Sequence, residues 1–574
     1  MGNNVYNLFA KQVEKNGKRK AVICDNKDYT YDEISKLVDY YSKLIMSFDL
    51  KIGRVALLIE RSVYSVVCEL AVLKAGYTFV PIDLGLPPNR IDYMLTNSNI
   101  DMIITFHCDY KINHGQAVLL DIENDYMING INHNRTRLKE DDLAYILYTS
   151  GTTGNPKGVM ISNQSLYNFI CGFYERVRFE NVQVILGLTS VSFDISIVEL
   201  VASLCYGFTL IMASDVEYKN PRLLKQLICK YSIDILQITP SMLSEMIYDK
   251  DYQFLDYIKY WLIGGEMLSV ESLKFIQAHT ATKIFNVYGP TEATIWSSVS
   301  DITTKSYIDI GEPLNGMKYH IELNETGSPL GELYIIGDNL SDGYINLSEE
   351  TNSKFINVLC DNQVVRAYRT GDVVCKNEYG EILYVGRNDT QVKINGHRIE
   401  LFEIESKIRS ILQDFDVCVL RYEQMLIAVI KCSVNVDIPN LVNALEKELP
   451  YYMIPSRFFF VEEFVYTISG KLDRNELLKK VIVDNKVDLY KGNDKFVEDV
   501  VTIISTYVNV SLVDAKSMDI PLVQLGMDSL SFIRVIVDIE EKFQIEVDSD
   551  VMDLECLDTV NRIVDYIRGK KENV

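Results

Sequence analysis

From Val22 to Gly386, short apolar runs alternate with amphipathic stretches. The runs include RVALLIE (54–60), DMIITF (101–106) and DILQIT (234–239), and a segment with helical periodicity follows each of them. Strands that alternate with helices indicate parallel sheets covered by helices. We therefore predict an α/β fold for most of this 574-residue chain.

The remaining residues change character twice. After Asp389 the apolar runs VCVLRYE (417–423), MLIAVIKC (425–432) and RFFFVEEF (457–464) predict strands with helices between them, as in a small α+β lid. A polar linker follows, and the helical periodicity beyond it predicts an acidic, all-α four-helix bundle. The predicted domains are a body at 1–388, a lid at 389–482, a linker at 483–494 and a helical domain at 495–574.

Acidic residues dominate the charge balance, because 80 Asp and Glu face 57 Lys and Arg, for a net charge of −23. A nucleic-acid partner is disfavoured, since phosphate backbones require a basic surface. The 11 cysteines include no C-x-x-C pair, so neither a disulfide framework nor a zinc site is expected. The first residues lack an apolar signal core, and no run of about 20 apolar residues occurs. We expect a cytoplasmic protein without membrane contact.

The sharpest local signal is the segment LYTSGTTGNPKG, which runs from Leu147 to Gly158 and follows the apolar run AYIL. Its glycines let backbone N–H groups close on an anion, and its hydroxyls add donors. Lys157 brings a positive charge to phosphate oxygens. A flexible surface loop is the alternative, but a buried strand before the loop favours phosphate binding. Gly158 stands where a Walker A motif has Ser or Thr, so a P-loop NTPase is disfavoured.

Further motifs are ordered along the chain: LKAGYTFVPID (73–83), SFDIS (192–196), NVYGPTEATI (286–295), GELYIIGDNLSDGY (331–344), YRTGD (368–372), GRNDTQVKINGHRIEL (386–401) and ISGKLDR (468–474). With YTSGTTGNPKG, this set resembles the adenylate-forming enzymes, and among them the adenylation domains of nonribosomal peptide synthetases. The resemblance covers nearly all of residues 1–480. It implies a large multi-subdomain adenylate-forming body with a small C-terminal lid.

The resemblance implies that a carboxylate attacks the α-phosphorus of ATP and expels pyrophosphate, a step that needs positioning and charge neutralisation. Glu292 is implied to hold Mg²⁺ through a hard oxygen ligand. Thr291 is implied to donate to the α-phosphate, and Tyr288 to lie near the adenine. The implied phosphate-loop residues are Thr149, Ser150, Gly151, Thr152, Thr153, Gly154 and Lys157.

The ribose and the lid have implied residues of their own. Asp372 is implied to bind both ribose hydroxyls, with assistance from Arg387. Lys471 of the lid is implied to contact the substrate carboxylate and a phosphate oxygen, which requires a moving lid with its hinge at Asp389. Taken singly, Asp372 is typical of a turn, Glu292 of a helix first turn and Lys471 of a solvated loop. Only the ordered set of motifs favours the functional interpretation.

A carrier domain is implied by LGMDSL (525–530), which opens an amphipathic helix in the acidic C-terminal region. The alternative interpretation is that Asp528 and Ser529 are simply the N-cap of this helix. The distance past the lid and the pattern together resemble a peptidyl carrier, in which Ser529 bears 4′-phosphopantetheine attached by a phosphopantetheinyl transferase. An acidic surface suits docking to basic patches of partner enzymes.

The substrate is implied to be an α-amino acid, because Asp194 would pair with its ammonium group. Trp296 and Gln237 are bulky and leave little room for a side chain, so the predicted pocket resembles the family's glycine-type pockets. Valine at Val198 and Val287, where such pockets have leucine, leaves alanine as an alternative. Trp296 could also be plain core packing. The implied pocket residues are Asp194, Ile195, Val198, Gln237, Leu262, Gly264, Val287, Ile295 and Trp296, with Lys471.

One rival function is an acyl- or aryl-CoA ligase, which Asp194 and the fused carrier disfavour. The other is an inactive scaffold, which the complete set of catalytic motifs disfavours.

In Asn395-Gly396-His397 the chain departs from the family, which often has arginine before this glycine. Because no condensation or thioesterase motif is visible, we expect a free-standing loading module. It would hand its aminoacyl group to a downstream condensation or tailoring enzyme. Some relatives need a small MbtH-like activator.

Overall fold

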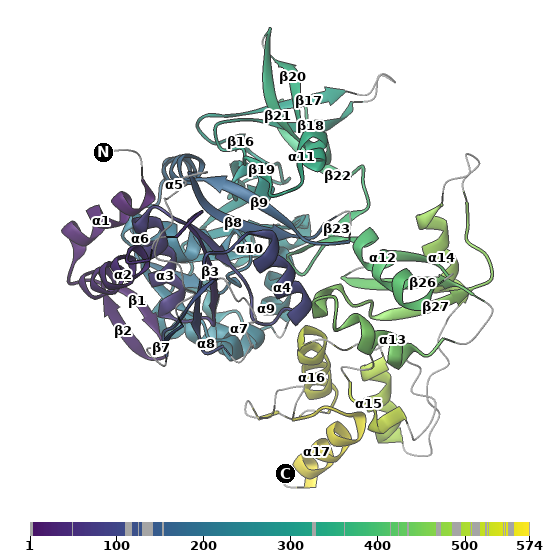
Figure 1. Cartoon of the computed structure of the whole chain (residues 1–574). Coiled ribbons are helices and arrows are strands. Elements are labelled where there is room, and N and C mark those ends of the chain that lie inside the picture. Colours follow the sequence, from purple (N-terminus) through teal and green to yellow (C-terminus); the bar gives the residue numbers. More distant parts are fainter. Residues whose placement is uncertain are drawn as a thin grey trace. The chain divides into compact units, whose positions relative to one another are not determined.

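The computed structural model describes residues 4–48, 50–108, 117–123, 126–128, 142–151, 154–248, 250–323, 329–360, 362–413, 415–422, 424–432, 436–466, 472–484, 495–505, 507, 517–522, 525, 527, 529–543, 545, 547–548, 551 and 556–572 (Figure 1). The chain folds into two compact units. The first comprises Met1–Gly151, Asn155–Ser244 and Asp251–Arg398. The second comprises Thr152–Gly154, Glu245–Lys250 and Ile399–Val574.

An eight-stranded sheet in the first unit has the order β19-β9-β8-β4-β3-β5-β6-β7. Its central strands β8, β4, β3, β5 and β6 are parallel, as the alternating pattern predicts, whereas β9, β19 and β7 add antiparallel edges. The strands are β3 (Arg54–Ile59), β4 (Thr78–Pro81), β5 (Met102–Phe106), β6 (Val118–Asp121), β7 (Tyr126–Ile128), β8 (Leu143–Thr149), β9 (Lys157–Ser162) and β19 (Gly343–Tyr344).

A nine-stranded sheet of the same unit has the order β16-β15-β14-β13-β12-β10-β11-β1-β2. Strands β14 to β1 are parallel, so the carboxyl ends of β12, β13 and β14 lie at one edge. The strands are β1 (Lys20–Cys24), β2 (Lys27–Thr30), β10 (Val184–Gly187), β11 (Thr209–Met212), β12 (Ile235–Ile238), β13 (Tyr260–Gly264), β14 (Lys283–Tyr288), β15 (Ser298–Asp301) and β16 (Glu312–Pro313).

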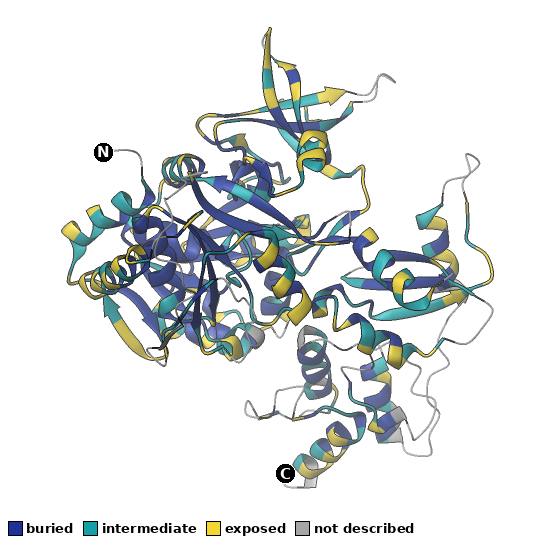
Figure 2. Cartoon of the chain, in the orientation of Figure 1, coloured by how far each residue is buried: buried dark blue, intermediate teal, exposed yellow. Residues whose placement is uncertain are grey.

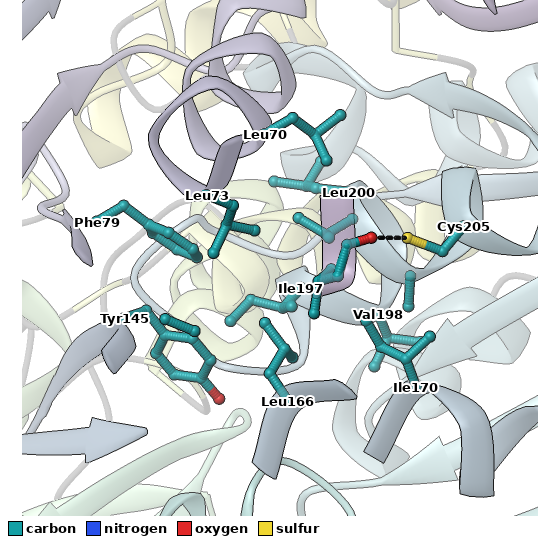
Figure 3. Close-up of a cluster of buried hydrophobic side chains, with 14 of the residues drawn as sticks. Leu70, Leu73, Phe79, Tyr145, Leu166, Ile170, Ile197, Val198, Leu200 and Cys205 are labelled. Carbon is teal, nitrogen blue, oxygen red and sulfur yellow. Dashed lines mark hydrogen bonds between the residues drawn. The ribbon is translucent and has the colours of Figure 1, made fainter. Parts of the chain in front are cut away.

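Helices α3 and α5 contact strands of both sheets and form a layer between them. Residues of α3 such as Leu70 and Leu73 pack with Phe79, Tyr145 and Val198 in the main core (Figure 3). The central strands β3, β4, β11 and β12 are buried, whereas exposed residues lie on the outer faces of helices and on edge strands such as β2 (Figure 2). The helices are α1 (Val5–Asn16), α2 (Tyr31–Met46), α3 (Val63–Ala75), α4 (Pro88–Asn97), α5 (Asn163–Val177), α6 (Ser203–Tyr206), α7 (Asp215–Lys219), α8 (Pro221–Tyr231), α9 (Pro240–Tyr248), α10 (Val270–His279) and α11 (Ser348–Lys354).

Two short turns in this unit matter for the site. The chain after the SFDIS segment forms a π-helix, η1 (Val198–Ala202), a rare geometry that is frequent at functional sites. A 3₁₀ turn, η3 (Thr291–Ala293), follows the carboxyl end of β14. Another 3₁₀ turn, η2 (Gln253–Asp256), precedes β13.

A third sheet of five strands completes the first unit, with the order β17-β18-β21-β20 and with β22 paired to β21. Neighbouring strands are antiparallel throughout. The strands are β17 (Met317–Leu323), β18 (Leu330–Gly337), β20 (Phe355–Cys360), β21 (Gln363–Lys376) and β22 (Ile382–Arg387).

The second unit contains the segment predicted as a lid. A hairpin of β23 (Gln391–Ile394) and β24 (His397–Glu400) leads into it from the first unit, and a three-stranded sheet packs against helices. The predicted strands at 417–423, 425–432 and 457–464 appear as β25 (Asp416–Tyr422), β26 (Met425–Lys431) and β27 (Arg457–Val461). The accompanying helices are α12 (Leu401–Leu412), α13 (Ile438–Leu445), η4 (Tyr451–Met453) and α14 (Arg474–Asp484).

The C-terminal part is helical, as predicted. Its described elements are α15 (Lys495–Ser505), η5 (Ser517–Asp519), α16 (Ser529–Phe543) and α17 (Val560–Glu572). Apolar residues of the three α-helices, among them Val500, Phe532 and Ile563, form a core of their own. The predicted α/β body, small α+β part and helical C-terminal part are thus confirmed. Across the described residues, no helix is both long and apolar enough to cross a bilayer.

Candidate active site

Strands β8 and β9 hold the two ends of the predicted phosphate loop. They pair so that Thr149 faces Lys157, and residues 150–156 connect them. The Lys157 side chain is only 1 % exposed. Its Nζ lies 3.6 Å from a carboxylate oxygen of Glu350 and 5.0 Å from the centre of the Tyr344 ring. The sheet therefore fixes a buried positive charge at the base of the loop.

The backbone of this loop requires glycine at its first turn. A Cβ at Gly151 would lie 1.8 Å from the carbonyl oxygen of Asn155, so no larger residue fits. The Ser150 hydroxyl donates to the carbonyl of Arg398 at 2.8 Å. The buried Thr149 hydroxyl, by contrast, has no partner in the described part of the chain. A buried polar group left unpaired costs about 1–3 kcal/mol, and a phosphate oxygen would remove that cost.

Glu292, the predicted Mg²⁺ ligand, lies on η3 with no exposed surface. Arg398 Nη1 is 2.7 Å from one of its carboxylate oxygens, and the Tyr344 hydroxyl donates to the other at 2.7 Å. Burial alone would raise the pKa of Glu292, but Arg398 and, more weakly, Lys157 and Tyr344 lower it to about 2. Glu292 is therefore ionised at neutral pH, as a ligand of Mg²⁺ must be. No group of three or more metal-binding side chains occurs among the described residues. A magnesium ion at Glu292 would take its further ligands from water and from substrate phosphates.

The predicted ribose residues form one hydrogen-bonded cluster. The Tyr288 hydroxyl and the Arg387 guanidinium both donate to the Asp372 carboxylate. Arg387 also binds Asp389, the predicted hinge residue, through two hydrogen bonds of 2.7 Å. Each carboxylate oxygen has two lone pairs, so Asp372 keeps acceptor capacity for ribose hydroxyls. Burial raises the pKa of Tyr288 well above its usual value, which keeps its hydroxyl a donor.

Asp194 lies in the turn that leads into η1. The Thr291 hydroxyl hydrogen-bonds to its carboxylate, whereas Asp194 Oδ2 is buried and has no hydrogen-bond partner within the described residues. Burial raises the pKa of Asp194 to about 6, although the bond from Thr291 lowers it. An ammonium group at Oδ2 would satisfy the open acceptor and favour the charged carboxylate.

Three predicted pocket residues form a fixed cluster at the carboxyl edge of the nine-stranded sheet. The indole Nε1 of Trp296 donates to Gln237 Oε1 at 3.2 Å. A Cβ at Gly264 would lie 2.9 Å from the Trp296 ring and 2.4 Å from the carbonyl oxygen of Val287. The ring thus lies against the bare backbone of Gly264. We call Gln237, Gly264 and Trp296 the selectivity cluster.

The segment before Trp296 has an unusual backbone. Thr294 and Ile295 have φ of 58° and 68°, in the left-handed region that β-branched residues rarely adopt. Such residues cost of order 1–3 kcal/mol each and persist where the surroundings over-determine them. Here the Thr294 hydroxyl donates to the Asn339 carbonyl at 2.6 Å, and Ile295 is fully buried. The strain accompanies a precise placement of Trp296.

The other predicted pocket residues surround this cluster. Leu262 pairs with Gln237 across β12 and β13, and Val287 pairs with Gly264 across β13 and β14. The Ile195 carbonyl accepts from Gln237 at 2.9 Å. The structure therefore brings these side chains to one sheet edge. Val198 belongs to the main core, where it packs near Ile197 and Leu200 (Figure 3).

Several predicted residues fall outside the described structure. These are Thr152, Thr153 and Lys471. Ser529 is the first residue of α16, and its side chain is not described. Gly154 is described and has φ of +86°, which favours glycine. The predicted roles of Lys471 and Ser529 remain predictions.

The hairpin of β23 and β24 supplies site residues that the sequence reasoning did not single out. Arg398 binds Glu292. Lys393 lies near Asp372 and Asp194. Burial lowers the pKa of Lys393, and the charges of these two carboxylates offset that lowering only in part. Both residues stand in the motif GRNDTQVKINGHRIEL, so the signal was present, but a motif does not tell which strand face meets the site.

The departure at Asn395-Gly396 has a structural reason. Both residues have positive φ, 50° and 80°, as the two central residues of a type I′ hairpin turn require. Asparagine and glycine are the residues that favour this turn. His397 then packs edge-on against Phe193, with ring centroids 4.9 Å apart. The sequence Asn-Gly here stabilises the hairpin that carries Arg398.

Comparison with known families agrees with this geometry. The family model described as AMP-binding enzyme matches residues 9–345, which is more than half of the chain. The chain belongs to this family. A second model, the phosphopantetheine attachment site, matches residues 498–567. An AMP-forming ligase domain is therefore joined to a carrier domain in one chain.

Curated relatives are nonribosomal peptide synthetases. Tyrocidine synthase 3 of Brevibacillus parabrevis is 31 % identical over 568 residues, which cover 96 % of this chain and 9 % of that protein. Gramicidin S synthase 1 of Brevibacillus brevis is 30 % identical over 590 residues, which cover 99 % of this chain and 52 % of that protein. The chain thus spans from about a tenth to about half of the length of these relatives.

Solved structures match the whole chain. Holo-PA1221, a nonribosomal peptide synthetase protein with adenylation and peptidyl carrier domains, matches with a TM-score of 0.82. At 22 % identity, over 99 % of this chain and 97 % of that one, the match shows the fold alone. Holo-AB3403, a four-domain synthetase, is 28 % identical with a TM-score of 0.60, over 99 % of this chain and 43 % of that one. The chain has the domain order of an adenylation–carrier didomain.

Proposed function

We propose that this chain activates glycine and loads it onto its own carrier domain. A glycine carboxylate oxygen attacks the α-phosphorus of ATP, and the bond to the bridging oxygen of the β-phosphate breaks. Glycyl-AMP forms and pyrophosphate leaves. The thiolate of the carrier's phosphopantetheine arm then attacks the acyl carbon, so that a thioester forms and AMP leaves.

The observation that carries the choice of glycine is the selectivity cluster. The Trp296 ring lies where a Cβ on Gly264 would already clash, so little space is left for a substrate side chain beside it. The open acceptor on Asp194 suits an α-ammonium group. The AB3403 synthetase was solved bound to AMP and glycine, which supports the same substrate class here.

Residues of strands β8, β9 and β21 would bind the nucleotide. Lys157 and the Thr149 hydroxyl would meet phosphate oxygens, and the Asp372 carboxylate would accept from the ribose hydroxyls. Thr291 hydrogen-bonds to Asp194, and it would also donate to the α-phosphate. When bound at Glu292, Mg²⁺ would neutralise phosphate charge.

The carrier and the lid complete the proposal. Ser529, at the start of α16, would bear the arm added by a phosphopantetheinyl transferase, and Lys471 would act from the lid. We propose domain boundaries at residues 388, 482 and 494 and a hinge at Asp389. A downstream condensation or tailoring enzyme would take the glycyl group. No disulfide joins two cysteines among the described residues, which supports a reducing, cytoplasmic setting.

ATP–pyrophosphate exchange tests the adenylation step. Glycine should drive faster exchange than alanine, serine or valine, because each larger side chain must displace the Trp296 ring. Discrimination against one methyl group is worth about 1–3 kcal/mol, or roughly 10- to 200-fold in kcat/KM. Faster exchange with any larger amino acid would refute glycine as the substrate and leave amino-acid adenylation intact.

Intact-protein mass spectrometry tests the loading step. After pantetheinylation, incubation with ATP and glycine should add one glycyl group to the wild-type chain and none to Ser529→Ala. The Ser529→Ala variant should keep normal exchange, since that reaction needs no thiol. Consumption of free CoA in place of carrier loading would identify the chain as a CoA ligase.

A further inference from the structure

Glu199 is a buried carboxylate outside the predicted set of site residues. It lies on η1, and its side chain has no exposed surface. Its Oε2 accepts from the backbone N–H groups of Leu188 and Thr189, each at 2.9 Å. Its Oε1 accepts from the Thr189 hydroxyl at 2.7 Å and from Gln237 Nε2 at 2.9 Å. Both oxygens are therefore held as acceptors by fixed donors.

This network determines how the Gln237 amide is turned. Gln237 Nε2 gives its second hydrogen to the Ile195 carbonyl at 2.9 Å, so both amide hydrogens are used. The Oε1 atom must then face Trp296, whose Nε1 donates to it at 3.2 Å. If the amide were reversed, its NH₂ group would face the Trp296 N–H, so that a donor would meet a donor. Its oxygen would face the Ile195 carbonyl, so that an acceptor would meet an acceptor. A buried unpaired polar group costs about 1–3 kcal/mol, so one orientation dominates.

The orientation of Gln237 bears directly on Trp296. A donor–acceptor pair with Gln237 anchors one edge of the indole, while the opposite edge lies on Gly264, where a Cβ would be 2.9 Å away. Without Gln237 Oε1 as acceptor, the indole N–H would be buried and unpaired. Rotation of the ring to another hydrogen-bond partner would then be favoured. The π-helix contributes because it brings Glu199 from η1 to the end of β12.

We propose that Glu199 is a positioning residue for substrate selection: it orients the Gln237 amide, which holds the Trp296 ring over Gly264. It does so without touching the substrate. The inference rests on the proposed function, because a fixed ring restricts the substrate only if the selectivity cluster faces the amino-acid side chain.

The first test is Glu199→Gln, which keeps the shape and replaces one acceptor oxygen by an NH₂ donor. That donor opposes Gln237 Nε2 and forces the Gln237 amide to turn. The ratio of kcat/KM for glycine to that for alanine, measured by ATP–pyrophosphate exchange, should fall roughly tenfold. If the variant folds poorly, Thr189→Val removes one donor to Glu199 and should shift the ratio in the same direction by a smaller factor.

A double-substitution cycle separates positioning from general damage. In a Trp296→Phe background the indole N–H is absent, so Glu199→Gln should change the ratio no further. Glu405→Gln is the matched control, because Glu405 is a buried carboxylate that accepts from Val419 N, Arg409 and Arg474 in the second unit. Glu405→Gln should leave the ratio unchanged.

A spectroscopic measurement tests the inference independently of the substrate. The chain has two tryptophans, so Trp261→Phe leaves Trp296 as the single indole fluorophore. In that background, Glu199→Gln should shift the emission of Trp296. If glycine is not the substrate, the emission shift should still occur, and the proposed function alone would fail. An unshifted emission, additive effects in the cycle, or equal losses for all amino acids would overturn the positioning role.

Discussion

The guanidinium of Arg398 lies 2.7 Å from the carboxylate of Glu292, whose side chain has no exposed surface. The predicted Mg²⁺ ligand is thus paired with a residue of the hairpin that leads into the lid segment. Breaking such a buried pair by removing one partner costs about 3–5 kcal/mol. A metal ion at Glu292 would therefore have to compete with Arg398 for the same carboxylate.

The variant Arg398→Ala should lower the Mg²⁺ concentration that gives half-maximal ATP–pyrophosphate exchange. The reason is that the metal no longer has to displace a guanidinium from Glu292. We expect a shift of roughly tenfold, equivalent to about 1.4 kcal/mol. Arg398→Lys keeps the charge without the planar fork and should give an intermediate value. An unchanged or higher Mg²⁺ requirement in Arg398→Ala would contradict competition at Glu292.

The affinity for the amino acid should depend on the protonation of Asp194. Burial raises the pKa of this carboxyl to about 6, so the carboxylate that pairs with an ammonium group is lost as the pH falls through 6. KM for glycine should therefore be flat above pH 7 and rise about tenfold per pH unit below 6. Exchange kinetics between pH 5 and 8 measure this. Asp194→Asn should have a high KM with no such slope, and a slope retained in that variant would assign the titration to another group.

Much of this site could be predicted from the sequence because the chemistry is local. Gly151, Lys157 and Glu292 stand in motifs whose residue types match phosphate and metal binding, and the alternating pattern predicted the parallel sheets that carry them. The Arg398–Glu292 pair could not be predicted, because it joins residues 106 positions apart through the register of a hairpin. Pattern reasoning gives the hairpin but not the side chain that its strands turn toward the site.

The Glu199 network was missed for a related reason. In sequence, Glu199 is an isolated acid among apolar residues, and nothing marks it as buried. Its role arises from the π-helix, which adds a residue to the turn and brings the carboxylate to Gln237. A single extra residue in a helical turn has no signature in composition or periodicity.

Widening the selectivity cluster should change which amino acids are accepted. Trp296→Ala removes the ring that lies against Gly264, so exchange with alanine and serine should rise relative to glycine by at least roughly tenfold. Loss of a buried aromatic also costs about 3–5 kcal/mol of stability, so the assay belongs well below the unfolding midpoint. Comparison of kcat/KM for the three amino acids is the measurement. An unchanged order of preference would make Trp296 a core residue without a role in selection.

Glu69 gives a prediction about stability. It lies on α3, is 1 % exposed, and its Oε2 has no partner in the part of the chain that the structure describes. Burial raises the pKa of Glu69 from its usual 4.5 to about 8, so the folded chain keeps it neutral at pH 7 while the unfolded chain ionises it. Stability is therefore lost progressively as the pH rises from about 4.5 to about 8.

The variant Glu69→Gln removes this ionisation with little change of shape. Near pH 4.5 it should unfold at a denaturant concentration close to that of the wild type, because both side chains are then neutral when folded. At pH 7 the variant should be more stable than the wild type by about 3 kcal/mol. The reason is that ionisation of Glu69 stabilises the unfolded state of the wild type, and the variant has no such ionisation. Urea unfolding of the first unit at both pH values measures the difference. A gap between variant and wild type that stays constant with pH would mean that Glu69 is charged in the folded chain, and a partner for its carboxylate would then have to exist.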